Sequence, residues 1–181
     1  MDSYEKYLAG DDTAMTQIVE AHKDGLMLYI NGFVRNIHVA EDLTEDVFFK
    51  LAVKKPKFRQ KSSFKTWLFA VGRNAALDYL RRCEKSHVVP LDELENLLHD
   101  EQSVEELYFK EERNLLLHRC IKTLKAEYAQ VLYLAYFENL SNEQTAKIMR
   151  KSKRQIENLI YRAKQALKIK LEKEGVDYEN R

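Results

Sequence analysis

The sequence predicts an all-α protein with two small helical domains joined by a flexible acidic linker. Only 5 glycines and 2 prolines occur in 181 residues, and sheets with tight turns usually need more of both. Apolar residues recur at three- and four-residue steps along most of the chain, which is typical of amphipathic helices. This periodicity is lost over residues 84–104, where Pro90 and many carboxylates occur. We therefore expect domains at 1–83 and 113–175, each long enough for one small core, with the linker at 84–112.

Three helices are expected in the first domain. The first extends over about residues 11–37, where the apolar stripe is longest. The second covers about 39–53 and ends before Pro56, because the residue preceding a proline is disfavoured in a helix. Ser62 or Ser63 caps a third helix that continues to about residue 83, since a serine hydroxyl accepts a free amide hydrogen at a helix start.

The second domain is expected to hold four helices, of which the last two form a helix-turn-helix. Helices over about 104–124 and 126–138 come first. The motifs Ser141-Asn142-Glu143-Gln144 and Ser152-Lys153-Arg154-Gln155 then both fit the capping box. Two helix starts 11 residues apart leave room for one short helix and a turn. Gly175 is the expected end of the last helix.

The formal charge of +1 conceals four blocks of alternating sign. Residues 1–49 carry −7 and residues 50–82 carry +9, whereas residues 83–112 carry −8 and residues 113–181 carry +7. A chain with two separate basic blocks can meet an anionic polymer at two places while its acidic blocks stay away.

The last helix of the helix-turn-helix has the composition of a duplex DNA reader. Between residues 147 and 170 there are 9 basic residues and one acidic residue, Glu157. Asparagine and glutamine pair with adenine and arginine with guanine at the major-groove edges. The polar side of the helix presents Lys153, Arg154, Gln155, Asn158 and Arg162. A solvated Lys/Arg face on an exposed helix is the alternative, but the paired caps favour DNA binding.

The basic block at 50–82 differs because aromatic residues are interleaved with its cations. Cations that follow a phosphate backbone beside rings that stack on bases are typical of a single-stranded nucleic-acid site. The alternative is that Phe64 and Phe69 belong to the core and that the lysines are merely solvated. The aromatic residues are Phe58, Phe64, Trp67, Phe69 and Tyr79.

Other kinds of site find little support in the sequence. His118-Arg119-Cys120 lacks a second pair of ligands, so neither a metal nor a cofactor is expected. No Gly-rich phosphate loop, nucleophile elbow or HExxH motif occurs, so an enzyme is not expected. Cys83 and Cys120 are far apart in the sequence, which favours free thiols in a reducing cytoplasm. No apolar stretch is long enough for a membrane span or typical of a signal peptide.

Several of these motifs together resemble a known family. Residues 40–48, Phe58-Arg59, residues 62–68 and residues 73–82 resemble conserved region 2 of extracytoplasmic-function (ECF) sigma factors of the sigma-70 family. Residues 140–167 resemble the region 4 helix-turn-helix of the same family. The motifs stand in family order and spacing, and the resemblance covers most of both domains.

The resemblance implies partners and a role for individual residues. The partners are core RNA polymerase, through the clamp helices of its largest subunit and its flap region, promoter DNA, and an anti-sigma factor. Polymerase docking would use Asp42, Glu45, Asp46 and Phe49. Capture of the melted −10 element would use Lys57, Arg59, Lys61, Ser63, Lys65, Trp67, Arg73, Asn74, Arg81 and Arg82. Duplex reading of the −35 element would use Ser152, Lys153, Arg154, Gln155, Asn158, Arg162 and Lys164.

Two departures from the family pattern lie in the helix-turn-helix. Arg150-Lys151 occupies a turn that often contains a glycine, and Glu157 stands where a basic residue is common. The leading hypothesis is a bacterial alternative sigma factor that directs promoter-specific initiation. One alternative is a helix-turn-helix regulator that binds operators without polymerase, and another is an interaction adaptor with solvated basic faces. The region 40–82 separates the first two, because an operator binder needs no single-strand site.

Overall fold

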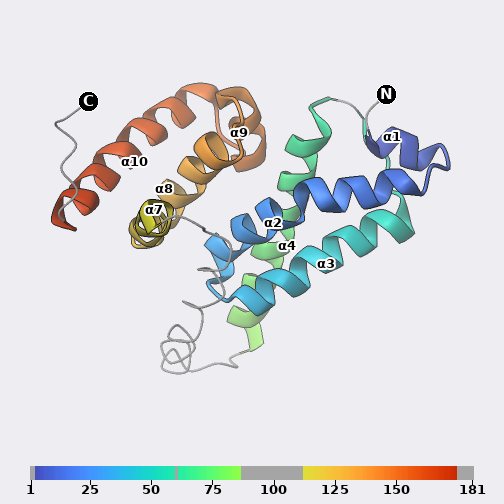
Figure 1. Cartoon of the computed structure of the whole chain (residues 1–181), viewed down its shortest axis with the longest axis horizontal. Helices are drawn as coiled ribbons and strands as arrows, with labels where there is room; N and C mark the ends of the chain where they lie inside the picture. The colour runs from blue at the N-terminus through green and yellow to red at the C-terminus, as the bar shows by residue number, and fades with distance from the viewer. Residues whose placement is uncertain (1–2, 60, 87–111, 175–181) are drawn as a thin grey trace.

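The computed structural model describes residues 3–59, 61–86 and 112–174, and these ranges contain helices and loops without a strand. This confirms the predicted all-α class. Most of the predicted linker, and the region of the predicted helix stop at Gly175, lie outside the described residues. The first domain contains α1 (Ser3–Leu8), α2 (Thr13–Val34), α3 (Ile37–Lys54) and α4 (Phe64–Ser86) (Figure 1). The second contains α7 (Glu112–Lys122), α8 (Ala126–Leu132), the π-helical turn η1 (Tyr133–Phe137), α9 (Asn142–Met149) and α10 (Lys153–Lys173).

Helix α2 is the centre of the first domain and packs against α1, α3 and α4. Its Leu26 and Ile30 are fully buried, as are Leu68 and Phe69 of α4. Helices α2 and α4 approach closely at Gly72, where an added Cβ would lie 2.6 Å from a methyl of Leu26. A larger residue at Gly72 would therefore force the buried Leu26 side chain to move.

Helix α1 was not predicted from the sequence. Its six residues are too few to show a helical period. Tyr4 is fully buried and its hydroxyl donates to the Pro56 carbonyl at 2.9 Å, while the Tyr7 hydroxyl donates to the Ala52 carbonyl at 2.9 Å. Helix α1 thus fixes the end of α3 and the start of the loop that follows it.

One predicted helix end was wrong, and another predicted helix changes its geometry part of the way along. The helix expected to reach residue 37 ends at Val34, because Arg35 adopts a left-handed backbone with φ of 52°. Asn36 then caps α3, accepting from the Val39 amide at 3.0 Å, so that α3 starts at Ile37. The helix expected over 126–138 changes from α to π geometry at Tyr133.

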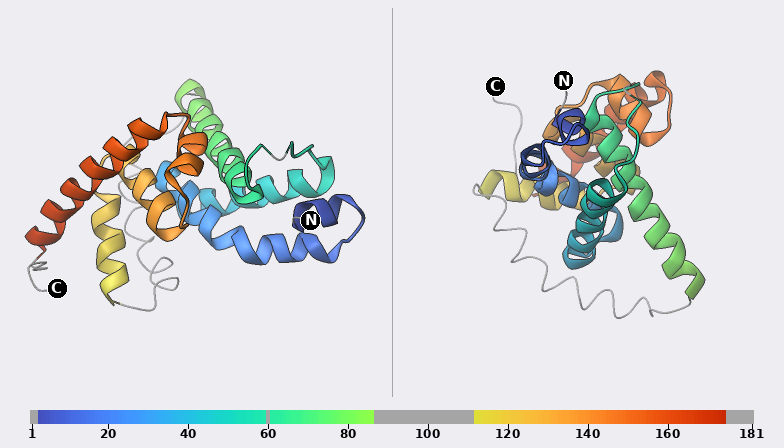
Figure 2. Two further views of the ribbon diagram at one scale, coloured as in Figure 1. Left: turned by 90° about the horizontal axis from the view of Figure 1, so that it is seen from above. Right: turned by 90° about the vertical axis from the view of Figure 1, so that its right-hand side faces the viewer.

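The two domains are packed against each other rather than held apart. Helix α8 and the turn η1 lie against α2, while α9 lies against α4 (Figures 1 and 2). The Tyr133 hydroxyl donates to the Gly25 carbonyl at 3.2 Å, and its ring stacks on Tyr29 with 6.1 Å between centroids. Buried apolar residues form one cluster that continues from the first domain into the second.

Candidate nucleic-acid interface

Both predicted capping boxes are present at the starts of α9 and α10. The Ser141 hydroxyl accepts from the Gln144 amide at 3.2 Å, and the Gln144 side chain accepts from the Ser141 amide at 2.8 Å. Ser152 and Gln155 repeat this arrangement with the same distances. Two short polar motifs therefore determine where both helices of the helix-turn-helix begin.

The turn between these helices accommodates Arg150 in a left-handed backbone. Arg150 has φ of 55°, and its amide donates to the Ala146 carbonyl to end α9. The next amide, that of Lys151, donates to the same carbonyl at 3.0 Å. The turn thus forms without glycine, which answers the question raised by this departure from the family pattern.

Helix α10 has one buried and one exposed side. Ile156 and Ala163 are fully buried. The exposed side carries every residue predicted to read duplex DNA, namely Ser152, Lys153, Arg154, Gln155, Asn158, Arg162 and Lys164. Lys153 pairs with Glu143 of α9, and this interaction lowers the pKa of Glu143 and raises that of Lys153. Glu157, the other departure from the family pattern, is also exposed.

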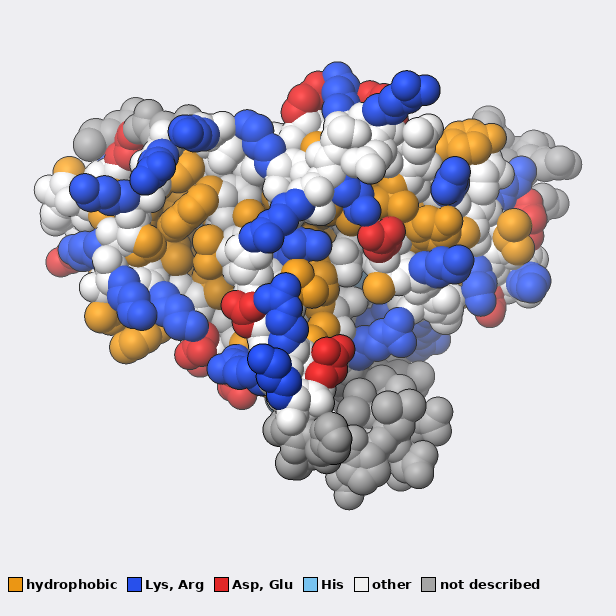
Figure 3. All heavy atoms as spheres, turned by 180° about the vertical axis from the view of Figure 1, so that it is seen from behind, with side chains coloured by type: hydrophobic (Ala, Val, Ile, Leu, Met, Phe, Trp, Pro, Cys, Tyr) orange, Lys and Arg blue, Asp and Glu red, His pale blue; other side chains and the backbone are white. Residues whose placement is uncertain are grey.

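The residues predicted for single-strand capture extend along the loop after α3 and along α4. Lys57, Arg59 and Lys61 are exposed in the loop. Ser63 caps α4, because its hydroxyl accepts from the Thr66 amide at 3.2 Å, as was expected of Ser62 or Ser63. Farther along α4, Arg73 and Asn74 are half-buried, whereas Arg81 and Arg82 are exposed. Lys and Arg side chains spread across the face shown in Figure 3.

The aromatic residues of this block divide into core and partly accessible groups. Phe64 and Phe69 are buried, in line with the core alternative. Trp67 is half-buried and packs beside Phe58, with 5.6 Å between ring centroids, and beside Phe64 at 5.7 Å. Tyr4 of the unpredicted helix α1 lies 5.6 Å from the Trp67 ring. The cluster holds the Trp67 ring against the end of the basic loop.

Helix α3 presents an exposed acidic and apolar face. Asp42, Glu45, Asp46 and Phe49, all predicted to dock on a partner, are exposed together. Phe49 has an exposed fraction of 66%, and Val53, one turn farther on, of 62%. Val53 was not among the predicted residues, although its spacing of four from Phe49 is a signal that it shares this face.

The second domain engages several of the predicted capture residues directly. Lys65 forms an ion pair with the Glu138 carboxylate at 2.8 Å and also donates to the Glu138 carbonyl at 2.8 Å. The Arg150 guanidinium donates to the Asn74 side-chain oxygen at 3.1 Å. Gln144 donates to the Ser63 hydroxyl at 3.3 Å. No motif signalled this contact, because its partners are 73 to 81 residues apart in the chain.

The rest of the described chain shows no metal centre or membrane helix. Within residues 3–59, 61–86 and 112–174, no group of three or more His, Cys, Asp or Glu side chains is placed to hold a metal ion. In the same ranges, every helix is too short or too polar to cross a membrane. Cys83 is half-buried and Cys120 is buried, and neither is part of a disulfide among the described residues.

Fold and surface thus define an all-α protein with a basic helix-turn-helix in its second domain. Residues 18–86 match the family model for Sigma-70 region 2, and residues 114–167 match that for Sigma-70, region 4. The chain therefore belongs to the sigma-70 family of RNA polymerase sigma factors, within its ECF group.

Curated relatives resemble the chain over most of its length. It is 29% identical to the RNA polymerase sigma-H factor of Pseudomonas aeruginosa, and the match covers 90% of this chain and 89% of that protein. It is 26% identical to the ECF RNA polymerase sigma factor SigM of Bacillus subtilis, with 84% and 91% covered.

Two solved structures share the fold. CnrH, in complex with the cytosolic domain of CnrY, has a TM-score of 0.64 and 20% identity, with 94% of this chain and 95% of that chain covered. The sigma factor RpoE, in complex with the anti-sigma factor NepR from Bartonella quintana, has a TM-score of 0.64 and 20% identity, with 87% and 96% covered.

Proposed function

We propose that this sigma factor brings core RNA polymerase to its promoters by reading two elements in two different forms. The second domain reads the −35 element as duplex, and the first domain captures the melted −10 element as a single strand. The main support for this proposal is the exposed face of α10. Its polar and basic residues lie on the side of the helix opposite the buried Ile156 and Ala163, and they start at the capped N-terminus of the helix. The N-terminal residues of a recognition helix are those that reach base edges.

Promoter opening then needs no chemical step by this chain. Unpaired bases that stack on an aromatic ring are stabilised by roughly 1–3 kcal/mol each. Trp67, held by its aromatic neighbours, is the ring that we assign to this stacking, and Asn74, about two turns farther along α4, is assigned to polar contacts. Lys57, Arg59 and Lys61 would follow the phosphates from the exposed loop. Captured bases shift the DNA toward the open state.

Docking on polymerase is assigned to the exposed face of α3. Asp42, Glu45 and Asp46 supply negative charge, and Phe49 with Val53 supplies exposed apolar surface. An apolar centre with a charged rim is typical of a protein–protein interface. With polymerase as its partner, the protein would act in the cytoplasm.

The contacts between the packed domains support a proposal for how the activity is regulated. Ser63, Lys65 and Asn74 cannot meet DNA freely while Gln144, Glu138 and Arg150 engage them. Strand capture therefore requires the domains to separate. We infer that a protein inhibitor of the anti-sigma class stabilises the packed form, since RpoE of Bartonella quintana was solved with such a partner.

Transcription with core polymerase on a genomic promoter library tests the proposal. The protein should give initiation at promoters that share one −35 and one −10 motif. Reversal of charge by Asp42→Lys with Glu45→Lys should weaken co-elution with core polymerase, while Glu20→Lys, on the exposed side of α2, should not. Operator binding without any polymerase-dependent initiation would contradict the proposal and favour a free-standing regulator.

A further inference from the structure

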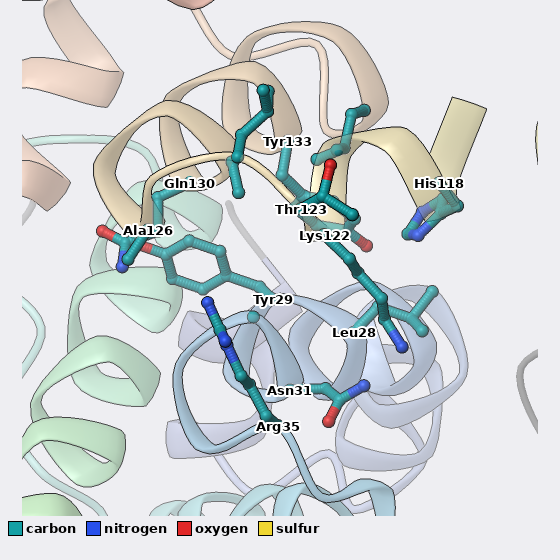
Figure 4. Close-up of a pocket in the computed structure, with 14 residues that line it drawn as sticks. Leu28, Tyr29, Asn31, Arg35, His118, Lys122, Thr123, Ala126, Gln130 and Tyr133 are labelled. Atoms are coloured by element: carbon teal, nitrogen blue, oxygen red, sulfur yellow. The ribbon is translucent and has the colours of Figure 1, made fainter. Parts of the chain in front are cut away.

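A cavity of about 300 Å³ lies between the two domains and has no role in the proposed function. Helix α2 forms one wall, and α7, α8 and the loop between them form the other (Figure 4). Much of the lining is apolar, with Leu28 from α2 facing Ile121 and Leu124 from the second domain. Small-molecule sites are typically concave, largely apolar and of about this size or larger.

The charged groups of this cavity favour an anion. Arg35 and Lys122 are among its lining residues, and none of the lining residues is an aspartate or glutamate. Figure 4 shows the Arg35 guanidinium rising toward Tyr29, and the Lys122 side chain extending toward Leu28. His118, also in the lining, is uncharged at neutral pH, because burial lowers its pKa to about 4.

A buried hydroxyl in the wall has an unused hydrogen-bonding capacity. Tyr29 has an exposed fraction of 2%, and its hydroxyl has no hydrogen-bond partner among the described residues. Its side chain lies across the cavity toward Ala126 and Gln130 (Figure 4). The hydroxyl oxygen exposes less than 1 Å² of surface, so it closes the wall of the cavity and is not a contact for a bound molecule.

We propose that this cavity binds an amphipathic monocarboxylate of the medium-chain fatty-acid type. The acyl chain lies against Leu28, Ile121 and Leu124, and the carboxylate lies at Arg35, while Lys122 adds positive charge from the other side of the cavity. Because its walls come from both domains, the occupied cavity favours the packed form over the separated one. The binding is independent of the proposed function, whereas its effect on strand capture rests on that function.

Calorimetric titration of the full chain with decanoate tests the binding. Decanol and decylamine are the matched probes, since they keep the chain but replace the anion by a neutral or a cationic group. Decanoate should bind at least about ten-fold more tightly than either, which corresponds to one good charge contact. Equal affinity for all three, or no decanoate binding, would overturn the proposal.

Variants locate the site. Arg35→Gln and Lys122→Gln should each weaken decanoate binding several-fold, and Lys6→Gln, an exposed cation of α1, should leave it unchanged. Gly32 lines the cavity, and a Cβ added there meets nothing within 4 Å. Gly32→Met should therefore fill the space and abolish decanoate binding without loss of thermal stability. Unchanged affinity in this variant would place the bound decanoate elsewhere and refute the assignment.

A strand-capture assay then tests the consequence. Decanoate should lower the affinity of the wild-type chain for a single-stranded −10 oligonucleotide and should have no effect on Gly32→Met. Decanoate that binds without lowering this affinity would contradict the coupling. Absence of strand binding by both proteins when each is bound to core polymerase, even without decanoate, would instead contradict the proposed function.

Discussion

Arg150 shows how one residue can serve both local and long-range structure. Its left-handed backbone closes the turn between α9 and α10, a conformation that costs a non-glycine residue about 1–2 kcal/mol. Its guanidinium in return donates to Asn74 in the other domain, which a glycine could not do. The sequence identified the position as unusual, but the contact that explains it depends on residues 76 positions away.

Single substitutions on α10 should distinguish the residues that read bases from those that bind phosphates. Arg154→Ala or Asn158→Ala should change which −35 sequences are preferred, because a bidentate base contact is worth about 1–3 kcal/mol of discrimination. Lys164→Ala should lower the affinity for all sequences alike, since Lys164 lies beyond the N-terminal turns of α10 that reach base edges and is assigned to a phosphate. Binding of the full chain to a randomised duplex library measures both. A Lys164→Ala variant with altered preference would contradict this division.

His118 should make the second domain sensitive to mild acid. The ring is 8% exposed and packs edge-on against Phe137 at 5.1 Å, and burial, then the charge of Lys122, lowers its pKa from 6.5 to about 4. Between these two values the unfolded chain binds the proton and the folded chain does not, so stability falls as the pH falls. From pH 7 to pH 5 the loss should be about 2 kcal/mol.

Urea unfolding at the two pH values, followed by far-UV circular dichroism, measures this loss. His118→Phe is the matched control, because it keeps the ring contacts with Tyr133 and Phe137 but cannot titrate. The variant should lose about 2 kcal/mol less than the wild type over the same interval. An equal loss in both proteins would show that other groups cause the acid sensitivity.

At the level of helices, short sequence motifs predict those helix ends that are determined by neighbouring residues in the chain. The starts of α9 and α10 could be predicted to the residue, because each cap lies within four residues of chain. The end of α2 could not, since it depends on a left-handed Arg35 that no breaker residue announces. The π turn η1 was also missed, because apolar spacing does not distinguish it from a continued α-helix.

The cap of α10 should matter more for DNA reading than that of α9. Ser152→Ala removes the acceptor for the Gln155 amide and should cost about 1 kcal/mol of stability. It should also weaken duplex binding, because the first turn of α10 carries Lys153, Arg154 and Gln155. Thermal unfolding and duplex titration give the two quantities.

Two matched variants test the interpretation of the cap. Ser152→Thr keeps a capping hydroxyl and should restore both stability and binding. Ser141→Ala should cost similar stability but less duplex affinity, because α9 does not carry the predicted base contacts. Equal loss of duplex binding in the Ser141 and Ser152 variants would mean that the cap acts only through global stability.

For the whole molecule, the alternation of charge along the sequence indicated which segments carry the surfaces assigned to DNA and to polymerase. The packing of the two domains against each other could not be predicted. The two basic blocks contain the surfaces assigned to DNA, and the first acidic block contains the exposed face of α3. The contacts between domains pair single residues far apart in sequence, among them Lys65 with Glu138. Such pairs follow no period or spacing, so only the folded arrangement reveals that capture residues are engaged.

Glu138 is the group whose removal should release the first domain. Its carboxylate is only 12% exposed and pairs with Lys65 at 2.8 Å, so Glu138→Gln leaves a partly buried lysine without its counter-charge. A loss of about 1 kcal/mol from the packed form would shift the balance toward separated domains roughly five-fold. The variant should therefore bind a single-stranded −10 oligonucleotide several-fold more tightly than the wild type, although every residue assigned to that strand is unchanged.

Fluorescence anisotropy of a labelled strand and small-angle X-ray scattering of the free chain measure capture and separation together. Glu127→Gln is the control, because Glu127 pairs with Lys151 inside the second domain at 3.0 Å and its loss should change neither quantity. Combining Glu138→Gln with Lys65→Ala should remove part of the gain, since Lys65 is then absent from the strand site. Tighter strand binding in the Glu138 variant at unchanged scattering would mean that Glu138 repels the strand directly, and domain packing would then not control capture.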